Sequence, residues 1–186
     1  ESACDAIDTG HSSTSIGAAL GLAKARDIRG ENHKVFAVIG DGALSGGMAY
    51  EALNNAARLK SNLIIVLNDN QMSIAKNVGG MSRYLGKIRT NRNYTGLKED
   101  VEKILQKMPH IGSVLTHRTR WIKDLIKRVL IPGMLFEDMG ITYIGPIDGH
   151  DVRQMVYAFE SAAKSSRAVL VHVSTQKGKG YPPAQK

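Results

Sequence analysis

The stretch VFAVIGDGALSGG, residues 35–47, decides how this sequence folds. Its first five residues are apolar and rich in β-branched side chains, which is typical of a strand buried in a parallel sheet. The glycine-rich segment GDGALSGG, residues 40–47, follows directly. Residues 46–60 predict a helix, and the apolar run LIIVL at residues 63–67 completes a βαβ unit with a right-handed crossover. The apolar stripe of this helix is expected to contain Met48, Ala52, Leu53, Ala56 and Leu59.

The alternation of helices and strands continues on both sides of this unit. Residues 13–29 predict a helix that buries Ile16, Leu20 and Ala23 and ends at Gly30. Residues 141–144 and 168–173 predict strands, with a helix at residues 152–164 between them. The inward residues of that last helix are expected to be Val152, Met155, Val156 and Phe159. The fold class is therefore α/β, with a mainly parallel sheet flanked by helices.

A basic segment interrupts this alternation. Residues 79–96 predict a loop and residues 97–108 and 114–130 predict amphipathic helices, so residues 79–133 form an insertion. Residues 76–133 hold 13 Lys and Arg but only 4 Asp and Glu, so the segment carries +9 although the whole chain carries +8. Nucleic acid is one ligand for such charge. We nevertheless expect no nucleic-acid partner, because no recognised motif and few aromatic residues accompany the charge.

The composition is that of an ordinary globular protein. With 186 residues, 42% of them hydrophobic, the chain is long enough for one domain with a real core. No run of 18 apolar residues occurs, so we predict neither a transmembrane helix nor a membrane partner. Cys4 is the only cysteine, which precludes an intrachain disulfide and fits the reducing cytoplasm. The sequence lacks an initial Met and begins in structured-looking sequence, so we expect a piece of a longer protein.

Two polar turns follow the two strands of the βαβ unit. GDGALSGG contains Asp41, and NDNQMSI at residues 68–74 contains Asn70. Ligands of open α/β sheets bind beyond the carboxyl ends of the strands, so both side chains can point into one crevice if the strands are neighbours. A carboxylate and a carboxamide oxygen suit Mg²⁺, which shares its remaining positions with phosphate and water. The helix that follows Gly46 directs its free N–H groups to the same place, which favours a metal-bridged diphosphate.

Other phosphate-binding loops fit this segment less well. A Walker loop needs Lys followed by Ser or Thr after its glycines, whereas Met48 follows here. The dinucleotide fingerprint G-x-G-x-x-G is one residue shorter than the spacing of Gly40, Gly42 and Gly46. Taken alone, Asp41 can equally be a helix cap or a turn residue. The pair of turns is more specific, because GDG, a helix, a buried strand and NDN form the thiamine diphosphate signature.

The whole chain resembles 1-deoxy-D-xylulose-5-phosphate synthases, a family of transketolase-like thiamine diphosphate enzymes. Besides the two turns, the resemblance rests on stretches near both ends of the sequence. These are TGHSSTSIGAALGLA at residues 9–23, YIGPIDGHD at 143–151 and KGKGYPPA at 177–184. GHSSTSI and NDNQMSIAKNVG favour this synthase over transketolase proper. The resemblance implies that the chain is one thiamine diphosphate-binding domain, residues 1–186, incomplete at its N-terminus.

The resemblance also implies a role for individual residues. Asp41 and Asn70 would bind Mg²⁺ through side-chain oxygens, and Met72 through its backbone carbonyl. The remaining cofactor-binding residues would be Gly10, His11, Ser12, Gly42, Ala43 and Tyr181, with Asn70 shared between metal and cofactor. Without the resemblance, His11 is better interpreted as a helix-entry residue satisfied by the backbone, and Tyr181 is equally an anchor for a linker.

The implied activity is the thiamine diphosphate- and Mg²⁺-dependent condensation of pyruvate with D-glyceraldehyde 3-phosphate. CO₂ is released, and the product serves isoprenoid, thiamine and pyridoxal phosphate synthesis. The family works as a cytoplasmic homodimer. Its catalytic glutamate, an upstream cofactor-contacting histidine and a C-terminal domain lie outside this sequence, so we expect the chain alone to be inactive. The alternatives are transketolase or another thiamine diphosphate enzyme, and a non-catalytic cofactor-binding module.

Two segments keep more than one interpretation. The basic insertion would attract the phosphorylated acceptor or close over the site, or it is a solvated arm or a face covered by further domains. In GPIDGHD, residues 145–151, one of Asp148 and Asp151 is expected to cap the following helix. No role is assigned to His150.

Overall fold

The computed structural model describes residues 2, 4–70, 72, 79–90 and 134–184. The strands are β1 (Phe36–Gly40), β2 (Ile64–Asp69), β3 (Thr142–Asp148) and β4 (Val169–Ser174). The longer helices are α1 (Ser15–Arg29), α3 (Gly47–Arg58), α4 (Gly80–Thr90) and α8 (Val152–Ala163). The short ones are α2 (Asp41–Leu44), α7 (Met134–Asp138) and the 3₁₀ turn η1 (Pro182–Ala184).

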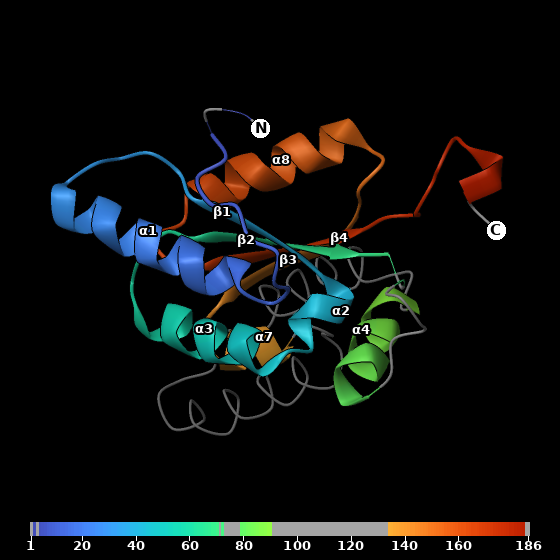
Figure 1. Cartoon of the computed structure of the whole chain (residues 1–186), viewed down its shortest axis with the longest axis horizontal. Helices are drawn as coiled ribbons and strands as arrows, with labels where there is room; N and C mark the ends of the chain where they lie inside the picture. The colour runs from blue at the N-terminus through green and yellow to red at the C-terminus, as the bar shows by residue number, and fades with distance from the viewer. Residues whose placement is uncertain (1, 3, 71, 73–78, 91–133, 185–186) are drawn as a thin grey trace, which may run out of the picture.

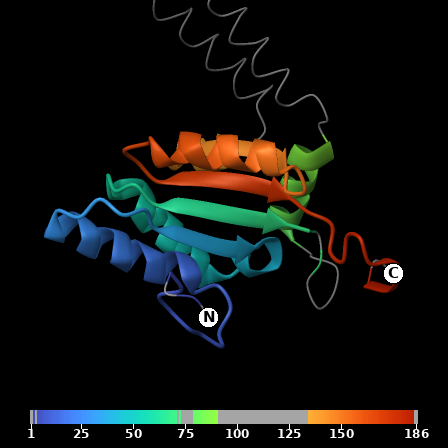
Figure 2. The same cartoon turned by 90° about the horizontal axis from the view of Figure 1, so that it is seen from above.

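The four strands form one parallel sheet in the order β1-β2-β4-β3. Figure 2 shows all the visible arrowheads pointing in the same direction, so the carboxyl ends of the strands gather at one edge. We call this the carboxyl edge. The predicted α/β class and the predicted parallel sheet are therefore confirmed.

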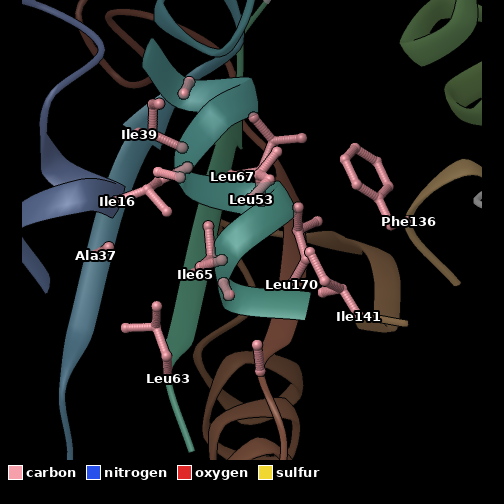
Figure 3. Close-up of a cluster of buried hydrophobic side chains, with 14 of the residues drawn as sticks. Ile16, Ala37, Ile39, Leu53, Leu63, Ile65, Leu67, Phe136, Ile141 and Leu170 are labelled. Carbon is pink, nitrogen blue, oxygen red and sulfur yellow. The ribbon is translucent and has the colours of Figure 1, made fainter. Parts of the chain in front are cut away.

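The main core lies between one face of the sheet and the layer of α1, α3 and α7 (Figure 1). Alternate residues of the strands point into it, as the period of two in a strand requires. Figure 3 shows Ile39 of β1, Leu67 of β2 and Leu53 of α3 meeting there. On α1, Ile16 and Ala23 are buried as predicted, and Gly30 ends the helix with φ 67°. On α3, Ala49 is buried and Met48 is exposed, so the predicted apolar stripe was wrong at that position.

The opposite face of the sheet is covered by α8 alone among the described elements (Figure 1). Ala158 and Ala162 of α8 are buried there, with Met155 and Phe159 packed beside them. The predicted inward positions Val152 and Val156 are instead exposed, because α8 turns its small residues toward the closely packed strands β3 and β4. On this face, the Phe36 ring of β1 packs edge-on against the Phe159 ring of α8, with the ring centroids 5.9 Å apart. Phe36 and Val38 are nevertheless 47% and 63% exposed, although the sequence predicted a buried strand here.

The structure also contains helices in the basic and glycine-rich segments where the sequence predicted none. Residues 80–90 form α4 rather than a loop, and α4 buries Leu85 and Ile88 against the main core. The glycine-rich turn after β1 contains the single helical turn α2. The predicted helices at residues 97–108 and 114–130 lie outside the described residues. None of the described helices has the length and apolarity needed to cross a membrane.

A polar clamp holds the opposite, amino-terminal end of the sheet. The guanidinium of Arg26 is buried and donates to the carbonyl oxygens of His33 at 3.1 Å and Asn62 at 2.9 Å. It also forms an ion pair with Asp27. The pKa of the Asp27 carboxyl lies below its ordinary value of 3.8. The largest cause is the hydrogen bond that Ser61 donates to it, and the second is the hydrogen bond from the Arg26 guanidinium. The clamp therefore ties the end of α1 to the segments that lead into β1 and β2.

This lowered pKa predicts a pH-dependent contribution to stability. The charged Asp27 carboxylate stabilises the fold above about pH 3.8, and the contribution is lost as the pH falls through the lower folded-state pKa. The Asp27→Asn variant should therefore be less stable than the unsubstituted chain at pH 7, and the difference should shrink below pH 3.8. Because the side chain is 33% exposed, we expect a modest effect.

The measurement is urea unfolding of both proteins across the pH range. Ser61→Ala removes the largest cause of the shift, so its stability should depend less on pH in the same range. A constant difference between Asp27→Asn and the unsubstituted chain from pH 7 to pH 2.5 would contradict the assignment.

Candidate functional site

The two predicted metal ligands leave neighbouring strands at the carboxyl edge. In the ladder between β1 and β2, Gly40 pairs with Asn68. Asp41 comes directly after Gly40 and opens α2, while Asn70 comes two residues after Asn68, just beyond the end of β2. The strand neighbourhood on which the shared crevice depended is thus confirmed. Asp41 is only 8% exposed, so its carboxylate lies within the edge and not on the outer surface.

A local hydrogen bond shapes the turn after β2. The side-chain carbonyl oxygen Oδ1 of Asn70 accepts a hydrogen bond from the backbone N–H of Met72 at 2.9 Å. This bond folds the backbone of Met72 back toward the Asn70 side chain. A carbonyl oxygen has two lone pairs, so Oδ1 can take this bond and still bind a cation. The side chain of Met72 is 52% exposed, which suits a residue predicted to act through its backbone.

The segment before α1 lies against the turn after β1. Ser13 Oγ donates to the backbone carbonyl of Ala43 at 2.7 Å, which joins residues 30 positions apart. Gly46 packs on the same serine, since a Cβ on Gly46 would lie 2.9 Å from Ser13 Cβ. The predicted pocket residues Gly10, His11 and Ser12 directly precede Ser13 and are exposed. The structure therefore brings the stretch at residues 10–13 to the stretch at residues 40–46.

Tyr181 and His150 lie apart from the residues at 10–13 and 40–46. Tyr181 follows β4 on a C-terminal extension that leaves the body of the domain (Figures 1 and 2). Its side chain is 64% exposed and makes no hydrogen bond within the described part of the chain. His150 Nε2 accepts a hydrogen bond from the Gln176 N–H at 2.9 Å, so its ring connects the end of β3 to the end of β4. The structure gives Tyr181 no link to the other predicted cofactor residues.

Asp151 is the helix cap predicted in the segment before α8. Its carboxylate accepts hydrogen bonds from the backbone N–H groups of Arg153 and Gln154. The hydrogen bonds from Gln154 backbone and side chain, with that from Arg153, lower the pKa of Asp151. Asp148 accepts instead from the N–H of His150.

Sequence reasoning missed a set of three buried polar side chains behind the carboxyl edge. Tyr143 Oη lies 2.7 Å from His172 Nδ1, and His172 Nε2 lies 3.1 Å from Asp69 Oδ2. All three residues are at most 1% exposed, and we call them the buried polar triad. The signal in the sequence was His172, which follows three apolar residues in the strand VLVHVS, because a polar side chain buried in a strand needs a hydrogen-bond partner.

The donors predicted at the carboxyl edge are, by their chemistry, of the kind that a hard divalent cation binds. The predicted set offers one carboxylate, one carboxamide oxygen and one backbone carbonyl, all of which are oxygen donors of the kind Mg²⁺ prefers. Among the described residues, no group of three His, Cys, Asp or Glu side chains gathers as a transition-metal site requires. The first turn of α3 contains no acidic residue, so its N–H groups are compatible with an anion.

Comparisons with known proteins give the family. The sequence model of the family described as 1-deoxy-D-xylulose-5-phosphate synthase matches residues 1–175. The chain belongs to this family. Over all 186 residues it is 62% identical to the 1-deoxy-D-xylulose-5-phosphate synthase of Lachnoclostridium phytofermentans and 55% identical to that of Clostridium kluyveri. In both cases it spans 30% of the relative's length, so it corresponds to under a third of these synthases.

A solved structure supports the fold of this synthase family member independently. The crystal structure of transketolase from Campylobacter jejuni superposes with a TM-score of 0.51 at 23% identity. The match covers 88% of this chain and 19% of that transketolase. At this identity the likeness concerns the fold alone. The preference for the synthase over transketolase proper, first drawn from two sequence stretches, thus agrees with the family match and with the named relatives.

The contact between Gly46 and Ser13 yields a prediction with a matched control. The Gly46→Ala substitution places a methyl group against the Ser13 side chain and should destabilise the fold by about 1–3 kcal/mol, the usual cost of overpacking. The adjacent Gly47→Ala substitution meets nothing within 4 Å at the start of α3, so it should be neutral or slightly stabilising. Urea denaturation measures both, and equal free energies of unfolding would refute the contact.

Proposed function

We propose that this chain supplies the metal- and diphosphate-binding part of a 1-deoxy-D-xylulose-5-phosphate synthase. The complete enzyme would condense pyruvate with D-glyceraldehyde 3-phosphate, release CO₂ and feed isoprenoid precursor synthesis. The observation that carries the proposal is the pairing of Gly40 with Asn68, which sends Asp41 and Asn70 out of the sheet at the same edge. Membership in the synthase family supplies the identity of the cofactor.

Each residue at the carboxyl edge would have a distinct task. Asp41 and Asn70 would hold Mg²⁺ through side-chain oxygens, and the Met72 backbone carbonyl would complete the protein's share of ligands. Gly42 and Ala43, in the turn held by Ser13, would contact the diphosphate with their backbone. Gly10, His11 and Ser12 would line the neighbouring wall.

The protein's contribution at this site is to bind and orient. Thiamine diphosphate, when bound, supplies the electron sink for decarboxylation of the 2-keto acid. The charge of Asp41 would counter the cation, and the burial of this residue would strengthen that attraction relative to water. Tyr181 would join the site only if the C-terminal extension is placed differently when the cofactor is bound.

The remaining assignments follow from the family and are part of the same proposal. The substrates would be pyruvate and D-glyceraldehyde 3-phosphate, the assembly a homodimer and the compartment the cytoplasm. Residues 1–186 would form one thiamine diphosphate-binding domain whose insertion, residues 79–133, includes α4. The exposed side chains of Phe36 and Val38 on β1 are compatible with a domain that has further protein beside it.

The proposal predicts that thiamine diphosphate binding requires Mg²⁺ and Asp41. Isothermal calorimetry should detect binding of thiamine diphosphate to the chain in the presence of Mg²⁺ and not after chelation. Asp41→Ala should weaken binding at least about tenfold, because it removes the charged ligand of the cation. Asp41→Asn retains an oxygen donor without the charge. Its affinity for thiamine diphosphate should therefore lie between those of Asp41→Ala and the unsubstituted chain.

Asp138→Ala is the matched control for this experiment. It removes an exposed carboxylate from the end of α7 and should leave binding unchanged. Equal thiamine diphosphate affinity for Asp41→Ala and the unsubstituted chain would contradict the proposed metal site. Thiamine diphosphate binding that is insensitive to chelation would contradict it as well.

A further inference from the structure

The buried polar triad has no task in the proposed binding of metal or cofactor, yet it is directly connected to the turn that carries Asn70. We propose that Asp69, His172 and Tyr143 are positioning residues, which fix the direction in which Asn70 leaves the sheet and so hold it as a metal ligand. This inference rests on the proposed function, because it concerns the same metal site. The three residues of the triad come from three different strands: Asp69 from β2, His172 from β4 and Tyr143 from β3.

The sheet register places each residue of the triad two positions closer to the carboxyl edge than the one before it. Tyr143 pairs with Leu170 in the ladder between β3 and β4, and His172 lies two residues further along β4. His172 in turn pairs with Leu67, and Asp69 lies two residues further along β2. Each step advances two residues, which keeps all three side chains on the face of the main core. The last step ends one residue before Asn70.

The two ring nitrogens of His172 bridge the other two residues, with Nδ1 beside Tyr143 Oη and Nε2 beside Asp69 Oδ2. In the neutral tautomer that carries its proton on Nε2, the Tyr143 hydroxyl donates to Nδ1 and the Nε2–H donates to the Asp69 carboxylate. In that tautomer the hydrogen bonds run in one direction, from the core to the edge. The Tyr143 ring is fixed at its other side by stacking on Phe136, with the ring centroids 6.0 Å apart and the planes within 3°.

The backbone next to the triad is also fixed. Gly145 lets β3 pass close to His172, since a Cβ at that position would lie 2.5 Å from the His172 carbonyl oxygen. At the carboxyl edge, the N–H of Thr175 donates to the Asp69 carbonyl at 2.9 Å. The Thr175 hydroxyl donates to Asn68 Oδ1 at 2.6 Å. Asn68 and Asp69 are therefore held through their side chains, and Asp69 through its backbone as well, immediately before Asn70.

The energetics favour a role beyond packing. A buried, ionisable pair contributes little net stability compared with well-packed apolar residues, because both groups lose their hydration. The same pair fixes the orientation of its two side chains, since hydrogen bonds restrict a side chain more than apolar contacts do. Residues behind metal ligands typically change metal affinity about tenfold or more when they are removed.

The experiment measures Mg²⁺ affinity by calorimetry at a fixed concentration of thiamine diphosphate. Tyr143→Phe keeps the stacked ring and removes only the hydroxyl, and we expect it to weaken Mg²⁺ binding about tenfold. His172→Leu should have at least this effect, and His172→Gln, which retains an N–H donor for Asp69, should restore part of the affinity. The control is Val171→Ala, on the opposite face of β4, which should lower thermal stability without changing Mg²⁺ affinity.

A double substitution tests whether the triad acts through Asn70. In an Asn70→Ala background, Tyr143→Phe should cause no further loss of Mg²⁺ affinity. The inference is overturned if Tyr143→Phe binds Mg²⁺ as the unsubstituted chain does, if Val171→Ala weakens binding equally, or if the loss persists without Asn70.

A measurement without metal separates this inference from the proposed function. In the metal-free chain, the NMR resonances of the Asn70 carboxamide should shift in Tyr143→Phe and stay in place in Val171→Ala. If the unsubstituted chain fails to bind Mg²⁺ or thiamine diphosphate, the proposed function fails, and the Asn70 resonances still decide whether the triad positions this side chain. Unmoved resonances in Tyr143→Phe would overturn the inference.

Discussion

The parallel hydrogen bonding between β1 and β2 is the constraint on which the candidate site depends. Because the strands run in the same direction, both end at the carboxyl edge, and the segments that follow them meet there. An antiparallel pair would have sent Asp41 and Asn70 to opposite ends of the sheet, whatever their chemistry. The strength of this constraint comes from β2, which is buried on both faces between the main core and α8 and therefore cannot slip without exposing apolar side chains. The sheet thus sets where the two predicted ligands leave it, with Asp41 at the start of α2 and Asn70 just beyond β2.

The segments at the carboxyl edge are held by short-range polar bonds as well as by apolar packing. Ser13 reaches the Ala43 carbonyl, Met72 donates to Asn70, and Thr175 spans Asn68 and Asp69. Each bond satisfies a backbone or side-chain group that the end of a strand would otherwise leave unpaired. The glycines have a comparable role where space is limited, because Gly46 leaves room for Ser13. Such bonds specify direction over a few residues, so a binding site can be precise although its residues are partly exposed.

The fold was predictable from the sequence because apolar runs and helical periodicity report burial directly. The runs at residues 35–39, 63–67 and 168–173 became β1, β2 and β4 within one or two residues. The failures at individual strand and helix positions have a common cause, which is that periodicity does not reveal which neighbour covers a face. On the face of α8, β1 meets Phe159 through Phe36 while Val38 stays exposed, and Val152 is exposed because α8 turns its alanines inward. The meeting of the two polar turns at one edge was predictable from their places after two successive strands. The roles of their residues, which come from the family resemblance, stay predictions. The triad was not, since it joins residues 69, 143 and 172, and only the strand order makes them neighbours.

The three residues Asn68, Asp69 and Asn70 show how a short motif can combine several tasks. Side chains alternate across a strand, so Asp69 points to the main core while Asn68 points to the other face. Asp69 meets His172 in the core, and Asn68 meets Thr175 at the end of β4. Asn70 lies just beyond the strand and is the first of the three whose side chain bonds within its own turn. If Asn70 alone mattered, an apolar residue at position 69 would be the simplest choice for the core. A buried carboxylate there makes physical sense when it has a hydrogen-bonded partner and when the direction of the next residue has to be fixed.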